Sequence, residues 1–181
     1  MMSNSEHAAA GTGLGNVDQG VAVAPTDFGA FFEAEHDRLF GALYLVTGQR
    51  QDAEELMQEA FLKVWERWSK VSDLESPTGY LYRTAMNAFR MRRRRAVVAL
   101  RRHAGRASRT DPIEIVETQD TVDRALATLT SRQRAALVLN DLLGFPSDEV
   151  ARMLGVSAST VRGLVMNARQ GFRRAIEVAD E

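Results

Sequence analysis

Ten arginines gather in one stretch of this 181-residue chain and could neutralise a run of phosphates. The stretch lies between Glu75 and Asp111 and contains no acidic residue. It therefore carries a charge of +10, while the rest of the chain has 13 Lys and Arg against 24 Asp and Glu. Arginine forms paired hydrogen bonds with phosphate, and a cationic helix on DNA gains free energy by releasing counterions. The ten are Arg83, Arg90, Arg92, Arg93, Arg94, Arg95, Arg101, Arg102, Arg106 and Arg109.

Aromatic residues lie close to these arginines, at Tyr80, Tyr82 and Phe89. Unpaired bases stack on such rings, each for roughly 1 to 3 kcal/mol. Arginines and aromatic rings together favour opened, partly single-stranded DNA over a closed duplex as the ligand. Two alternatives stay open at this point: a solvated patch that binds RNA without specificity, and a core position for Tyr80 and Phe89.

Other side-chain chemistry is poorly supported. The chain has no cysteine, which excludes disulfides, thiolate nucleophiles and Cys-ligated metals, and its three histidines are scattered. The carboxylate pairs Glu54-Glu55 and Asp148-Glu149 are adjacent on expected helices, where neighbouring side chains do not converge on one substrate. We therefore expect no catalytic residue, no metal and no cofactor, and an enzyme is the least favoured class.

No apolar run approaches the roughly 20 residues that a bilayer span needs. The first residues lack the basic and apolar regions of a signal peptide. We expect a cytoplasmic protein without membrane insertion, with residues 1–24 as a disordered tail because they are rich in Gly, Ala, Ser and Asn.

The elements that must position the arginines are helices. Apolar residues recur at steps of three and four over residues 27–46, and Gly48 is expected to end that helix. A second helix is predicted over residues 51–68, with an acidic first turn. Ser76-Pro77 then supplies an N-cap and a first-turn proline for a third helix, which continues into the arginines.

The pattern breaks over residues 96–120, which reads as a basic linker with a helical extension at its start. Beyond it, a short helix is expected over residues 122–129, and Thr130 and Gln133 fit a capping box for a helix to about Leu143. No strand pattern appears. The predicted fold class is all-α: two small helical domains joined by a flexible linker, the C-terminal one with a helix-turn-helix.

The helix-turn-helix is predicted over residues 147–174. Two helices are joined by a short turn at Gly155, and Ala151 is small where the helices approach. The second helix of this motif enters the major groove. Its predicted base or phosphate contacts are Ser159, Thr160, Arg162 and Asn167, with Arg169, Arg173 and Arg174 along the DNA backbone. An ordinary helical hairpin is the alternative, and cations suited to a helix C-terminus explain Arg173 and Arg174 equally well.

In combination, these motifs resemble the extracytoplasmic-function (ECF) sigma factors, small bacterial transcription initiation factors of the sigma-70 superfamily, over residues 27–178. Region 2 of that family is similar to DAEELMQEAFLKVWERW (52–68) and GYLYRTAMNAFRMRRRR (79–95). Region 4 is similar to residues 129–169, which include the predicted helix-turn-helix. The resemblance assigns residues 25–95 to a region 2 domain, 96–120 to the basic linker and 121–181 to a region 4 domain.

The resemblance also implies roles for individual residues. The polymerase core would bind Asp52, Glu55, Gln58 and Glu59. The loop 72–76 and the start of the third helix would hold a base flipped from the minus-ten element. That element would be contacted by Tyr80, Arg83, Asn87, Arg90, Arg94 and Arg95. The minus-35 element would be contacted by Ser159, Thr160, Arg162, Asn167 and Arg169. The implied partners are bacterial RNA polymerase core, promoter DNA and an anti-sigma factor.

The chain departs from the family pattern at several positions. Met91 stands where an Asp is usual, and Leu164, Met166 and Asn167 replace common basic residues in the recognition helix. Gly163 sits inside that helix at a cost near 1 kcal/mol relative to Ala. Two rival functions remain: a stand-alone helix-turn-helix regulator with an N-terminal sensing or dimerisation bundle, and an adaptor or anti-regulator with incidental basic character.

Overall fold

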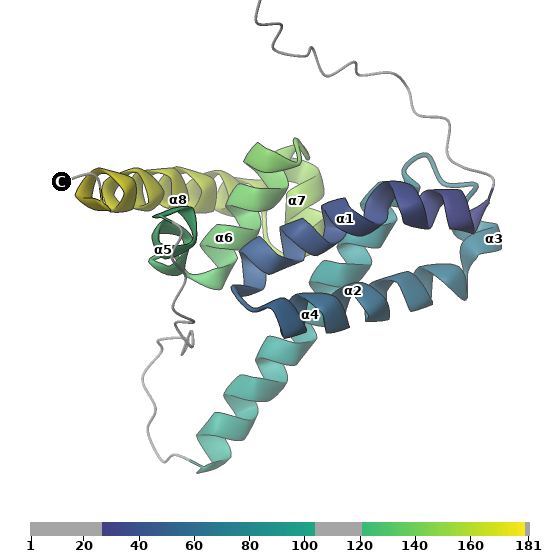
Figure 1. Cartoon of the computed structure of the whole chain (residues 1–181), viewed down its shortest axis with the longest axis horizontal. Coiled ribbons are helices and arrows are strands. Elements are labelled where there is room, and N and C mark those ends of the chain that lie inside the picture. The colour runs from purple at the N-terminus through teal and green to yellow at the C-terminus, as the bar shows by residue number, and fades with distance from the viewer. Residues whose placement is uncertain (1–26, 104–120, 180–181) are drawn as a thin grey trace, which may run out of the picture.

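The computed structural model describes residues 27–103 and 121–179, and within these ranges it is all helical, without a strand. The all-α prediction is confirmed. Most of the expected linker and the N-terminal tail lie outside the described residues. The helices of the first module are α1 (Phe28–Thr47), α2 (Arg50–Trp65), α3 (Trp68–Val71) and α4 (Pro77–His103) (Figure 1). Those of the second are α5 (Thr121–Ala127), α6 (Ser131–Leu137), the π-helix η1 (Val138–Leu142), α7 (Ser147–Leu154) and α8 (Ala158–Ala179).

Local capping fixes both ends of α1, and the end at Gly48 is the one that the sequence predicts. The Asp27 carboxylate accepts a hydrogen bond from the Gly29 backbone N–H at 3.2 Å, which satisfies a donor of the first turn. At the other end Gly48 has a φ of 74° and donates its N–H to the Tyr44 carbonyl at 2.7 Å. Only glycine adopts this left-handed conformation readily, so α1 ends there and the chain turns back into α2.

The end of α2 differs from the prediction. A helix to Trp68 fits the apolar spacing, but α2 ends at Trp65 and the backbone of Arg67 leaves the helical region at φ −121° and ψ 16°. The short helix α3 then carries Trp68 to the α1 aromatic residues, with ring centroids 4.9 Å from Phe31 and 5.4 Å from Phe28. Tertiary packing of the indole outweighs continuation of the helix.

The long helix α4 starts where predicted and extends further. The Ser76 hydroxyl accepts the Gly79 N–H at 3.0 Å, and Pro77 occupies the first turn. The helix then passes residue 95 and reaches His103, so the first part of the expected linker is the anticipated helical extension. Ala, Leu and Arg in this stretch favour helix, and Gly105 is the first residue beyond it with a strong opposing preference.

The second module begins with the predicted capping box. The Gln133 N–H donates to the Thr130 hydroxyl at 3.3 Å, while the Gln133 side chain accepts the Thr130 N–H at 2.9 Å. The expected single helix to Leu143 is observed as α6 followed by one π-helical turn, η1. Gly144, at a φ of 74°, follows η1.

The capping box gives a testable contribution to stability. Thr130→Ala removes the acceptor for the Gln133 N–H and is expected to lower the free energy of unfolding by about 1 kcal/mol. Thermal or urea unfolding of the full chain measures this loss. Thr130→Ser keeps the hydroxyl and should stay close to the parent, so equal losses in both variants would contradict the capping argument.

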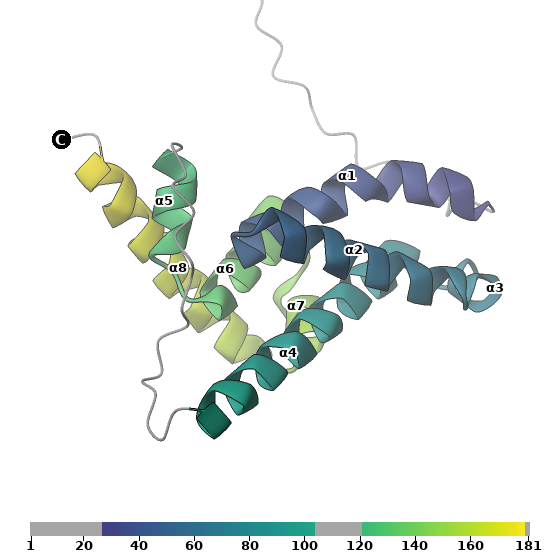
Figure 2. The ribbon, with the colours of Figure 1, turned by 60° about the horizontal axis from the view of Figure 1, so that its bottom comes forward.

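The two modules pack directly on each other. Helix α4 contacts α7, and α1 contacts α6 (Figure 2). Buried residues of both modules form one continuous hydrophobic cluster, which runs from Leu39 and Leu81 to Val150 and Met153. At its centre the Tyr82 ring is 1% exposed and its centroid lies 5.2 Å from that of Phe145, in the loop before α7.

A carboxylate is buried beside this junction. Glu35 of α1 is 7% exposed and accepts a hydrogen bond from the Thr78 hydroxyl at 3.0 Å, with Arg38 at 3.7 Å. Its second oxygen has no hydrogen-bond partner among the described residues. Burial raises the pKa of Glu35, against smaller opposing effects of Thr78 and Arg38.

The raised pKa makes stability depend on pH in a defined direction. Between the unfolded pKa near 4.5 and the higher folded pKa, the folded state binds more protons than the unfolded chain. The free energy of unfolding contributed by Glu35 therefore falls as the pH rises through that window. Glu35→Gln is expected to lose less stability than the parent between pH 5 and pH 7, as measured by urea unfolding at each pH. Glu33→Gln, an exposed change on the same helix, is the control. If the free energy of unfolding of Glu35→Gln falls with pH as steeply as that of the parent, the assignment to Glu35 is refuted.

No helix in the described ranges combines the length and apolar character needed to cross a membrane. Over the same residues, no group of three or more His, Asp or Glu side chains is placed to hold a metal ion.

Candidate nucleic-acid and polymerase interfaces

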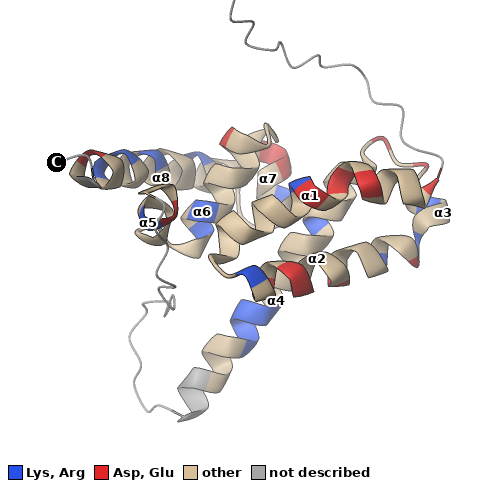
Figure 3. Ribbon diagram, viewed as in Figure 1, with Lys and Arg blue, Asp and Glu red and all other residues tan. Residues whose placement is uncertain are grey.

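Five of the six residues predicted to contact the minus-ten element form a single stripe along α4. Tyr80, Arg83, Asn87, Arg90 and Arg94 follow one another at steps of three and four, the spacing of one helix face. All are exposed except Tyr80, which is half-buried. Arg95, the sixth, is exposed one position beyond the stripe. Figure 3 shows the arginines concentrated on the lower half of α4.

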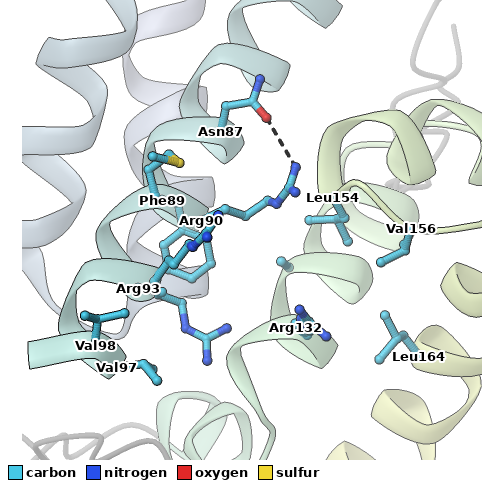
Figure 4. A pocket seen from close by; sticks show the side chains of 13 residues that line it. Asn87, Phe89, Arg90, Arg93, Val97, Val98, Arg132, Leu154, Val156 and Leu164 are labelled. Atoms are coloured by element: carbon cyan, nitrogen blue, oxygen red, sulfur yellow. Dashed lines mark hydrogen bonds between the residues drawn. The ribbon is translucent and has the colours of Figure 1, made fainter. Parts of the chain in front are cut away.

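Contacts within the stripe hold its side chains in place. The Arg83 guanidinium lies over the Tyr80 ring, 5.2 Å from its centroid. Asn87 accepts a hydrogen bond through Oδ1 from Arg90 at 3.3 Å, which leaves the amide nitrogen to donate elsewhere (Figure 4). Phe89, by contrast, is 7% exposed and belongs to the core, so it is not available for stacking.

Arg92 points away from the stripe and ties α4 to α2. Its guanidinium pairs with the Asp52 carboxylate at 3.1 Å and with the Glu55 carboxylate at 2.8 Å. Both acids were predicted to bind polymerase, and the structure shows them engaged within the chain while partly exposed. Glu59 pairs with Lys63 on the same helix at 2.6 Å, and Gln58 is exposed. The three acids are thus ordered by neighbours and not simply solvated.

Two apolar residues on α2 were missed by the sequence reasoning. Leu62 and Trp65 are 54% and 60% exposed. With Glu55 and Gln58 they complete a face at steps of three, four and three residues. We call Glu55, Gln58, Leu62 and Trp65 the α2 face. The signal was available in the sequence, because both residues lie off the buried stripe of an amphipathic helix.

The helix-turn-helix places its predicted reading residues on the open side of α8. The Ser157 hydroxyl accepts the Thr160 N–H at 3.1 Å and bonds to the hydroxyls of Ser159 at 2.9 Å and Thr160 at 2.8 Å. Four predicted contacts, Ser159, Thr160, Arg162 and Asn167, are exposed. These hydroxyls and side chains lie at and beyond the N-terminus of the recognition helix, where such motifs contact base edges.

The residues of α8 that depart from the family pattern lie in two environments, the core and the exposed surface. Leu164 is half-buried and packs on the shared core, so it is not a reading position. Met166 is 57% exposed beside Asn167 and offers an apolar contact where a cation is common. Arg169 forms two hydrogen bonds of 2.7 Å with the Asp141 carboxylate of η1, which fixes its guanidinium at the edge of the module.

Two cavities are lined jointly by residues of α4 and of the second module. The larger, about 810 Å³, is lined by Asn87, Arg90 and Arg93 on one side and by Leu154, Val156 and Leu164 on the other (Figure 4). The smaller, about 250 Å³, lies beside the loop that the resemblance assigns to a flipped base. It is lined by Ser76, Gly79, Tyr80, Arg83, Glu149, Arg152 and Met153, among others.

Comparison with known proteins agrees with this arrangement. The chain matches sigma-70 region 2 over residues 31–97 and sigma-70 region 4 over residues 119–170. The first match covers most of α1 and the stripe of α4, and the second covers α7 and the first part of α8. These matches define a protein with two sigma-70 regions on one chain.

Individual relatives extend the match to most of the chain. It is 30% identical over 159 residues to the ECF RNA polymerase sigma factor SigM of Mycobacterium tuberculosis, covering 82% of this chain and 76% of SigM. It is 32% identical to SigG of the same species over 176 residues, covering 79% of this chain and 47% of SigG. The chain belongs to the ECF sigma factors of the sigma-70 family. It spans about half the length of SigG and of SigE of Mycolicibacterium smegmatis.

Solved structures share the fold. The sigma factor RpoE of Bartonella quintana, determined in complex with the anti-sigma factor NepR, aligns with a TM-score of 0.66 at 22% identity. That alignment covers 85% of this chain and 99% of RpoE. The PhyRSL–NepR complex of Sphingomonas sp. Fr1 gives a TM-score of 0.56 at 19% identity, covering 83% of this chain and 89% of the other. At these identities the likeness concerns the fold.

Proposed function

We propose that this chain is a non-enzymatic initiation factor that binds RNA polymerase core and directs promoter recognition, DNA melting and transcription initiation. The observation that carries the proposal is the presence, on one chain of this family, of an arginine stripe with an ordered Asn87 and a separate helix-turn-helix. The arginine stripe with Asn87 suits the exposed bases of an opened DNA strand, and the helix-turn-helix suits the major groove of closed duplex DNA. Polymerisation chemistry would belong to the partner.

In this proposal the minus-ten element is read by the α4 stripe with Arg95. Phosphates of the displaced strand would follow Arg83, Arg90, Arg94 and Arg95, while Asn87 donates to a base edge through its free amide nitrogen. Tyr80, held under Arg83, offers a partly exposed ring for stacking. The minus-35 element is read by Ser159, Thr160, Arg162 and Asn167, with Arg169 at the DNA backbone.

The polymerase core binds the α2 face and the neighbouring acids Asp52 and Glu59. Exposed aromatic and aliphatic side chains ringed by charge are typical of protein interfaces, and Leu62 and Trp65 fit that description. A soluble acidic face would not require two large apolar side chains in the same stripe. We further propose action in the cytoplasm, where the polymerase is, and control by an anti-sigma factor, the kind of partner seen with RpoE.

The decisive experiment is run-off transcription from fragments of genomic DNA with purified core polymerase, with and without the chain. Defined start sites that depend on the chain would support the proposal. A gel shift on the same fragments tests the alternative function of a stand-alone helix-turn-helix regulator, because such a protein would bind duplex DNA tightly without polymerase. The family membership disfavours that alternative. Absence of any chain-dependent start site, with the core enzyme shown to be active, would contradict the proposed function.

A further inference from the structure

The glycine inside the recognition helix is not explained by the fold. Gly163 lies in the first half of α8, where glycine lowers helix stability relative to alanine. Its backbone does not adopt the left-handed conformation that favours glycine. A Cβ added to Gly163 would meet no atom within 4 Å beyond its chain neighbours and the backbone of α8. A Cβ on Gly171 of the same helix would instead lie 2.8 Å from Cδ2 of Leu129, so packing explains Gly171 but not Gly163.

Gly163 lies near the centre of the exposed face of α8. The buried side of this helix consists of Val161, Val165 and Ala168. With about 100° between successive residues of a helix, Gly163 stands nearly opposite that side. Its neighbours on the exposed face, at steps of three and four residues, are Ser159, Thr160, Met166 and Asn167. The glycine thus leaves a gap in the middle of the surface proposed to read the minus-35 element.

The side chains around this gap are short or uncharged. Between Ala158 and Asn167, Arg162 is the one charged residue. A lysine or arginine reaches a phosphate or a base on a long stem, whereas a hydroxyl or an amide reaches a base edge when the helix backbone comes close to it. Glycine permits such an approach of the backbone to a ligand. The glycine and the loss of long cations therefore have one explanation, which is a recognition helix that lies deep in the major groove.

The chemistry of Met166 and Asn167 selects a base pair. Asparagine forms two hydrogen bonds with adenine, at N6 and N7, and an apolar side chain contacts the C5-methyl group of thymine. An A·T base pair presents both features in the major groove. Asn167 forms no hydrogen bond within the described part of the chain, and Met166 is 57% exposed. Both side chains are therefore available to a DNA ligand.

We propose that Gly163 and Met166 are specificity-determining residues of the recognition helix, and that with Asn167 they direct it to an A·T base pair of the minus-35 element. Gly163 lets the base pair come within reach, Asn167 forms hydrogen bonds with the adenine, and Met166 contacts the thymine methyl group. The inference rests on the proposed function, because it names the class of DNA sequence that the helix-turn-helix would select.

Promoter DNA with a randomised upstream segment tests the inference. The full chain in complex with polymerase core selects duplexes from this pool, and their sequences are determined. Each thymine of the selected segment is then replaced by uracil, which lacks only the C5-methyl group. The affinity of the complex for both duplexes is measured for the parent, Gly163→Ala, Met166→Ala and Asn167→Ala. Gly41→Ala is the matched control, because a Cβ on Gly41 of α1 would also meet no atom within 4 Å.

We expect the parent to require an A·T base pair at one position, and Asn167→Ala to relax this requirement. The parent should bind the thymine duplex about fourfold more tightly than the uracil duplex, which is the value of one buried methyl group, and Met166→Ala should lose this difference. Gly163→Ala should bind the selected duplex at least about fivefold more weakly, while Gly41→Ala should bind like the parent. Both glycine variants should raise the midpoint of thermal unfolding by about 2 to 4 °C, so weaker binding by Gly163→Ala is not a folding defect.

Equal affinity of the parent for the thymine and uracil duplexes would overturn the inference. The same holds for a thymine preference that persists in Met166→Ala, or for a Gly163→Ala variant that binds as tightly as the parent. If no genomic fragment gives a start site that depends on the chain, the proposed function fails instead. Selection by the full chain alone from random duplexes, with the same variants, then decides whether the recognition helix prefers an A·T base pair.

Discussion

Replacing Trp65 with alanine is expected to weaken binding of the chain to polymerase core by at least about 30-fold, or about 2 kcal/mol. The indole is 60% exposed at the end of the α2 face and contributes little to the core, so its removal should leave the free chain folded. A large aromatic side chain that becomes buried in a partner is the type of residue that dominates interface energies. Leu62→Ala should act in the same direction with a smaller effect.

The measurement is an equilibrium titration of fluorescently labelled chain with core enzyme. Leu142→Ala is the matched control, because Leu142 is also an exposed leucine, at 63%, but lies in η1 away from α2. Unfolding curves of all three variants show whether the fold is intact. Equal affinities for Trp65→Ala and Leu142→Ala would remove α2 from the proposed polymerase site.

Asn87→Ala is expected to reduce promoter-dependent initiation roughly 5-fold to 150-fold while polymerase binding stays unchanged. The estimate follows from about 1 to 3 kcal/mol for a specific side-chain contact with a base. Asn87 is exposed and its carbonyl is already used by Arg90, so the alanine change removes a base donor without opening the core.

Open-complex formation and run-off product should be measured at saturating concentrations of the chain. Met91→Ala, an exposed change on the same helix, is the surface control. Loss of polymerase affinity in Asn87→Ala would indicate a structural role instead. Undiminished initiation would exclude Asn87 as a reader of the opened strand.

The helix ends that carry local capping chemistry could be predicted from the sequence. Asp27 and Gly48 bound α1, Thr130 and Gln133 form the expected box, and Gly155 ends α7. The end of α2 could not be predicted this way. No glycine or proline marks Arg67, and the break arises because the Trp68 indole packs on Phe28 and Phe31, far away in sequence.

In the candidate site, too, local features could be predicted from the sequence and tertiary contacts could not. Spacing alone places Tyr80, Arg83, Asn87, Arg90 and Arg94 on one face of α4. Periodicity shows which face of a helix is apolar, but not which helix covers it. The docking of α4 on α7 and the pairing of Arg92 with acids 37 and 40 residues earlier both depend on tertiary contacts.

Arg92 has a mechanical consequence for a complex with polymerase. Its guanidinium holds Asp52 and Glu55 of α2 at once, and it lies in the same turn of α4 as Arg94 and Arg95. A polymerase that binds α2 would therefore also fix the orientation of α4 and of its DNA-contacting arginines, because the Arg92 ion pairs join the two helices. Raising the ionic strength should weaken these ion pairs. Transcription start sites should then become less precise at salt concentrations lower than those that release the chain from polymerase.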